Sequence, residues 1–80
     1  MLIDLNNTYL PGNIRYLRRR FHLSRRALAA LAGIPLRELR QMEGKAPPPV
    51  DYAVAVRFCE IFGLSMELLF HEKNPRCSIR

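Results

Sequence analysis

The stretch "LAGIPLRELR" (residues 31–40) joins two helical patterns across a very short break. The first pattern stops at Gly33, and a new one starts directly after Pro35. Glycine adopts the positive φ with which many helices end, and proline fits at the start of a helix because the N–H that it lacks would be unpaired there. The sequence therefore predicts two helices held at a steep, fixed angle by a tight turn.

The two helices of this unit have clear inner and outer sides. Ser24 is expected to cap the first helix, whose packing face consists of Leu28, Ala29, Leu31 and Ala32. On the second helix, Pro35 takes the first position, and Leu39 and Met42 are expected to point inward. By the i, i+3, i+4 rule, the outward cluster consists of Leu36, Arg37, Arg40 and Gln41.

Three further helices flank this unit. The first is expected to start at Thr8, with Pro11 in its first turn, and to end near His22. Residues 44–49 form an extended loop because three consecutive prolines exclude both helix and sheet. Asp51 is expected to cap the fourth helix and Ser65 the fifth. The apolar stripe expected on the fourth helix consists of Tyr52, Val56, Cys59 and Phe62, flanked by Ala55 and Phe58.

The chain has the size and composition of one small helical domain. It has 80 residues, of which 49% are hydrophobic, enough for a compact core. The predicted fold class is all-α, with five short helices. The predicted division is an N-terminal arm at 1–7, a helical domain at 8–72 and a polar tail at 73–80. The sequence leaves open whether the arm contains a short strand or is irregular.

The charge balance favours a polyanionic partner. The formal net charge is +6, and 11 of the 13 basic residues are arginine, whose planar fork matches phosphate and guanine. The start of the chain does not resemble a signal peptide, and no apolar run is long enough to span a bilayer, so we expect a cytoplasmic protein without a membrane partner. Cys59 and Cys77 have no metal-ligand spacing, and Cys59 is expected in the core with Cys77 as a free thiol. We expect no metal, no cofactor and no enzymatic activity.

The two helices around Gly33 match the helix-turn-helix, which places its second helix in the major groove of DNA. Arg25 and Arg26 lie at the start of the helix that ends at Gly33, next to the positive end of its dipole, where cations are unfavourable. Two arginines at this position favour an external anion, and phosphate is the obvious candidate. From the chemistry of the side chains, Arg37 would read guanine, Gln41 would read adenine and Leu36 would contact a thymine methyl group.

The sequence resembles the Xre-type helix-turn-helix family, which includes the lambdoid phage repressors and Cro. The stretches that carry the resemblance are "NIRYLRRRFHLSRRALAALAGIPLRELRQME" (residues 13–43) and "FCEIFGLSMELLF" (residues 58–70). Together they span about residues 8–70, most of the chain. The resemblance implies a five-helix lambda-repressor-like fold.

The resemblance also implies roles for individual residues. Those at the base-reading positions are Leu36, Arg37 and Gln41, with Arg40 beside them. From the helix-dipole argument and the resemblance together, the residues assigned to DNA phosphates are Ser24, Arg25, Arg26 and Lys45. Arg18 and Glu43 match a paired Arg and Glu that tie the helix expected near residues 8–22 to the helix that follows Pro35. The chain departs from the family pattern at Pro35, which replaces the usual Ser or Thr cap, at apolar Leu36, and in the loop after Glu43, where Lys45 is the only basic candidate for a phosphate contact.

The functional hypothesis is a sequence-specific regulator of transcription that binds double-stranded DNA. We expect a repressor of bacterial or phage origin that binds a palindromic operator as a homodimer, because one such unit contacts few base pairs. An alternative is an antitoxin-like protein that also binds a protein partner, such as a toxin or an antirepressor. Another is a protein-interaction domain without DNA binding, which the arginines at 25, 37 and 40 disfavour.

Overall fold

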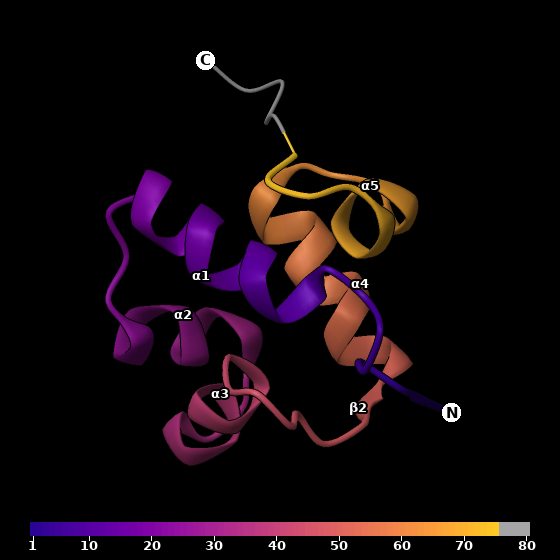
Figure 1. The fold of residues 1–80 in the computed structure, drawn as a ribbon. Helices are drawn as coiled ribbons and strands as arrows, with labels where there is room; N and C mark the ends of the chain where they lie inside the picture. The colour runs from indigo at the N-terminus through magenta and orange to yellow at the C-terminus, as the bar shows by residue number, and fades with distance from the viewer. Residues whose placement is uncertain (76–80) are drawn as a thin grey trace.

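The computed structural model describes residues 1–75, and within this range the chain is mostly helical, with five helices and a small two-stranded sheet (Figure 1). The elements are β1 (Leu2–Ile3), α1 (Leu10–Arg20), α2 (Arg25–Ala32), α3 (Leu36–Met42), β2 (Val50–Asp51), α4 (Tyr52–Phe62) and α5 (Met66–His71). The expected number of helices is confirmed. In the view of Figure 1, α3 lies at one end of the molecule and α5 at the other. No helix within residues 1–75 is long and apolar enough to cross a bilayer.

The ends of the helices follow local sequence signals. Ser24 and Ser65 each accept a hydrogen bond from the backbone N–H three residues later, at 3.0 and 3.2 Å, and so cap α2 and α5 as expected. Gly33 ends α2 with a φ of 72°, also as expected. Two details differ: α1 starts at Leu10 with Tyr9 in the cap position, and Pro35 precedes α3 as its cap instead of opening the helix.

A single core fills the space between the helices. Its largest members, Phe58 and Phe62 of α4, are completely buried, and the ring of Phe21 packs edge-on against that of Phe62 with centroids 5.2 Å apart. The other fully buried large apolar side chains are Leu5, Leu10, Ile14, Leu17, Leu28, Leu39, Met42 and Leu69. The core therefore draws on all five helices and on the N-terminal segment.

The apolar face expected on α4 is confirmed in part: Phe62 is buried as expected, but the buried face is centred on Ala55 and Phe58, which were expected at its flank. The buried face consists of Ala55, Phe58 and Phe62, whereas Tyr52 is 49% exposed and Val56 and Cys59 are only partly buried. The helix packs against both α2 and α5, and these two neighbours select the face. Apolar residues occur around most of this helix, so periodicity alone could not choose between the faces.

Leu31 was expected in the packing face of α2 but is 54% exposed. Leu28, Ala29 and Ala32 form that face and are buried. Because the two alanines are small, α3 and α4 can pack closely against this side of α2, and Leu31 remains outside the contact.

The N-terminal segment contains a strand, which settles the alternative left open by the sequence. β1 pairs antiparallel with β2, with Leu2 opposite Asp51 and Ile3 opposite Val50. Asp51 occupies the cap position of α4, but its side chain makes no capping hydrogen bond and instead accepts one from the amino group of Met1 at 3.3 Å. Pairing with β1 therefore replaces the expected side-chain cap.

Asn13 on α1 holds the end of α5. Its amide nitrogen donates to the carbonyl oxygens of Leu69 and Glu72, both at 2.7 Å, and its amide oxygen accepts from the backbone N–H of Asn74 at 2.8 Å. Asn13 is 1% exposed, and Pro75 is also fully buried. The packed part of the chain thus extends into the segment expected as a polar tail, while Cys77, expected there as a free thiol, lies outside the described residues.

Candidate nucleic-acid interface

The turn between α2 and α3 is built from backbone hydrogen bonds. The N–H groups of Gly33 and Ile34 donate to the carbonyl oxygens of Ala30 and Ala29, at 3.2 and 3.0 Å, and so close the end of α2. Ile34 is partly buried against the core, and Pro35 has an extended backbone (ψ 148°) that leads directly into α3. The backbone hydrogen bonds of the turn and the packing of Ile34 against the core therefore fix the orientation of α3 relative to α2.

The two sides of α3 differ sharply. Leu39 and Met42 are buried, as expected, whereas Arg37, Arg40 and Gln41 are exposed. Leu36 differs from the prediction because it is partly buried and packs against the core. Only the exposed part of its side chain remains for an external contact, and the exposed polar residues of α3 are Arg37, Glu38, Arg40 and Gln41.

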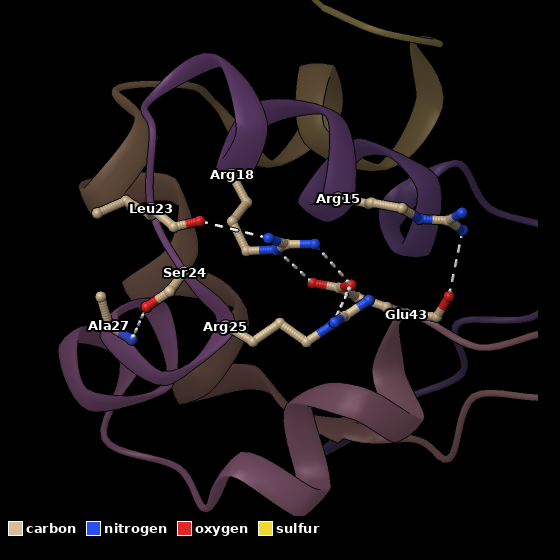
Figure 2. Close-up of polar contacts among 7 residues, drawn as sticks. All are labelled: Arg15, Arg18, Leu23, Ser24, Arg25, Ala27 and Glu43. Atoms are coloured by element: carbon tan, nitrogen blue, oxygen red, sulfur yellow. Dashed lines mark hydrogen bonds and ion pairs between the residues drawn. The ribbon is translucent and has the colours of Figure 1, made fainter.

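Glu43 lies at the end of α3 and is the centre of a cluster of arginines (Figure 2). Arg18 of α1 forms a two-pronged ion pair with it: Nε lies 3.0 Å from Oε2, and Nη2 lies 3.3 Å from Oε1. Both side chains are nearly buried, 10% exposed for Arg18 and 4% for Glu43. Nη1 of Arg18 also donates to the carbonyl oxygen of Leu23 at 3.3 Å, just before α2. The structure thus brings Arg18 and Glu43 together and ties α1, the start of α2 and the end of α3.

Two further arginines reach Glu43 from different elements. Nε of Arg25 donates to Oε1 of Glu43 at 3.1 Å, and Nη2 of Arg15 donates to the Glu43 carbonyl oxygen at 3.3 Å (Figure 2). The side chain of Arg25 remains 46% exposed. Sequence reasoning assigned Arg25 to phosphate and missed this internal contact, because nothing in the local pattern indicates which residues lie at the far end of α3.

The other residues assigned to phosphate lie around the same corner of the molecule. Arg26 and Lys45 are exposed, and within residues 1–75 neither forms an ion pair. The hydroxyl of Ser24 is engaged as the α2 cap. Because Arg25 at the start of α2 contacts Glu43 at the end of α3, the starting turn of α2 and the loop with Lys45 lie on either side of one cluster. Positive charge therefore borders the polar face of α3.

The described residues contain neither a metal-ligand cluster nor an activated thiol. No group of three or more His, Cys, Asp or Glu side chains within residues 1–75 is placed to hold a metal ion. Burial raises the pKa of the Cys59 thiol, and the nearby Glu60 carboxylate raises it further. A thiol with a raised pKa is mostly protonated at neutral pH and is a poor nucleophile.

A comparison of this chain with family models, curated proteins and solved structures finds no match.

Proposed function

We propose that the chain is a sequence-specific double-stranded DNA-binding regulator of transcription, with the helix-turn-helix architecture of the Xre-type family. In this proposal α2, the turn at Gly33 and α3 form the DNA-binding unit, and α3 enters the major groove. The single observation that carries the proposal is the outer face of α3, where Arg37, Arg40 and Gln41 are exposed on a helix whose opposite side is fixed in the core.

The residue types on this face suit recognition of base edges. An arginine can donate two parallel hydrogen bonds to guanine O6 and N7, and a glutamine amide can pair with adenine N6 and N7. We assign base reading to Arg37 and Gln41, with Arg40 beside them. Leu36 has a smaller part, because only its exposed portion can contact a thymine methyl group.

The charges around α3 suit contacts with the DNA backbone. Arg26 and Lys45 are exposed without ion pairs among the described residues, and Arg25 keeps about half of its side chain exposed while it contacts Glu43. Glu43 orients Arg25 through Nε, and the two Nη groups make no hydrogen bond with any described residue. Arg25 is thus available to a phosphate in a preset position, which lowers the entropy lost on binding.

A homodimer that represses transcription from a palindromic operator remains the proposed mode of action. A single α3 contacts few base pairs, and two copies related by a two-fold axis double the number of bases that are read.

Salt dependence of duplex binding tests the proposal. If Arg25, Arg26 and Lys45 each neutralise one phosphate, log Kobs should fall with log[salt] with a slope of about −2.7 per protomer. The measurement is fluorescence anisotropy of a labelled random-sequence duplex at increasing salt concentration. As a control, Glu67→Gln changes the net charge by one unit on α5, which lies at the opposite end of the molecule from α3 (Figure 1), and should leave the slope unchanged. Absence of binding at low salt, or a flat response to salt, would reject DNA binding.

A further inference from the structure

A second basic surface lies on α1, outside the helix-turn-helix unit. An open hollow of about 780 Å³ runs along this helix and is lined by Gly12, Arg15, Tyr16, Arg19, Arg20 and His22. The guanidinium carbon of Arg20 lies 6.0 Å from the centre of the Tyr16 ring, within range of a cation–π contact. None of the residues that line the hollow is acidic, and neither Arg19 nor Arg20 has an ion-pair partner within residues 1–75.

This hollow adjoins a second one at Gly12. The second hollow, of about 300 Å³, is lined by Lys45 and Lys73 and also contains no acidic residue. Gly12 lines both hollows, so they lie side by side at the start of α1. We call the combined surface the α1 track and define it by its five cations: Arg15, Arg19, Arg20, Lys45 and Lys73.

The α1 track is continuous with the proposed DNA-binding surface. Lys45 follows α3 by three residues, and Arg15 donates to the carbonyl oxygen of Glu43, the residue that ends α3. On α1, Arg15 and Arg19 are four residues apart, so they lie on one side of the helix with an axial rise of about 6 Å between them. Lys45, Arg15 and Arg19 therefore lead from the end of α3 along one side of α1.

We propose that the α1 track binds the phosphate backbone of duplex DNA that flanks the sequence read by α3. This inference rests on the proposed function and extends it to a longer footprint. A row of cations without carboxylates suits an evenly spaced line of phosphates, which carries no sequence information. An acidic peptide is the less suitable ligand, because peptide interfaces are anchored by apolar side chains in pockets, and the one aromatic ring in the larger hollow is associated with Arg20.

The test compares two duplexes that share one central sequence, taken from a selection with the wild-type protein. The short duplex ends at the selected site, and the long duplex has about one additional helical turn, roughly 10 base pairs, at each end. The variant Arg19→Gln/Arg20→Gln removes two track cations that are exposed and make no ion pair or side-chain hydrogen bond within the described residues. Glu67→Gln, on α5, serves as the control for a change of net charge outside the α1 track.

If the track binds flanking phosphates, the double variant should bind the long duplex with a salt slope shallower by about 1.8 per protomer. When the salt concentration rises fourfold, the affinity should fall about 3.5-fold less for each phosphate contact that is lost. The same variant should match the wild type on the short duplex, and its sequence preference should be unchanged. Equal slopes for wild type and variant on the long duplex would overturn the inference while leaving the proposed function intact. If the wild type binds neither duplex, both proposals fail.

Discussion

The buried ion pair between Arg18 and Glu43 allows the energetic link between the core and α3 to be measured. The perturbations are Glu43→Ala, Arg18→Met and the double substitution, with methionine chosen because it keeps much of the apolar stem of Arg18. The side chain of Glu43 forms its hydrogen bonds with Arg18 and Arg25 and not with the outer face of α3, so the prediction concerns stability and the position of α3.

The expected magnitudes follow from the contacts that each substitution leaves behind. Glu43→Ala strands the Arg18 guanidinium, which is 10% exposed and keeps only the Leu23 carbonyl as a partner, and should cost about 3–5 kcal/mol. Arg18→Met leaves the Glu43 carboxylate paired with Arg25 at 3.1 Å, so the expected loss is smaller, about 1.5–3 kcal/mol. Arg25→Ala should cost only about 0–1 kcal/mol, because this side chain is half exposed and its contact with Glu43 is screened by water.

The assay is urea unfolding followed by circular dichroism at low temperature. A domain of this size has a stability of roughly 4–12 kcal/mol, so the Glu43 variant should still fold or be close to its transition. The double variant should lose less than the sum of the single losses, with a coupling energy of about 0.5–3 kcal/mol. Strictly additive losses, or equal effects of Arg18→Met and Arg25→Ala, would refute the role assigned to the pair. If Glu43→Ala does not fold, the comparison of Arg18→Met with Arg25→Ala still decides the question.

Three further predictions concern other parts of the fold. Gly33→Ala should destabilise the domain by about 1–2 kcal/mol in thermal or urea unfolding, because φ is 72° there and an added Cβ would lie 2.7 Å from Nη1 of Arg57; an unchanged midpoint would contradict the turn geometry. Asn13→Ala should cost about 1–3 kcal/mol and increase amide exchange at the end of α5, since buried carbonyl groups lose their donor; unchanged exchange in α5 would contradict this. In a Cys77→Ser background, alkylation of Cys59 should rise with pH at a midpoint above that of a free thiol, about 8.5. Because folding raises the pKa of the Cys59 thiol, the stability that the protonated thiol contributes is fully present below the unfolded pKa and is lost as pH rises through the folded pKa. An alkylation midpoint at or below that of free cysteine would contradict the burial of the thiol.

Local signals in the sequence predicted the number of helices and some of their ends, whereas the expected starts of α1, α3 and α4 differ in detail. Ser24, Ser65 and Gly33 act within three or four residues of their own positions, so their capping roles are visible in the sequence itself. Apart from Leu36, the exposed side of α3 was predicted for the same reason, because one turn of helix decides which residues share a face.

Features that depend on distant contacts were harder to predict. The β1–β2 pairing joins segments about 50 residues apart, and the hydrogen bonds of Asn13 reach residues 56 to 61 positions away. The buried face of α4 is selected by two neighbouring helices, and the contact of Arg25 with Glu43 depends on the angle between α2 and α3. The pairing of Arg18 with Glu43 was expected only because the sequence resembles a family in which such a pair occurs.

The most direct test of the central claim, that α3 reads base edges, is selection of bound sequences from a random duplex pool. The wild type, Arg37→Ala and Arg26→Ala would be compared on the enriched site and on random DNA. We expect one enriched sequence, a loss of about 1–3 kcal/mol on that site for Arg37→Ala with relaxed preference at one position, and a uniform loss on all sequences for Arg26→Ala. Failure to enrich any sequence, or the same loss on specific and random DNA for Arg37→Ala, would contradict base reading by α3.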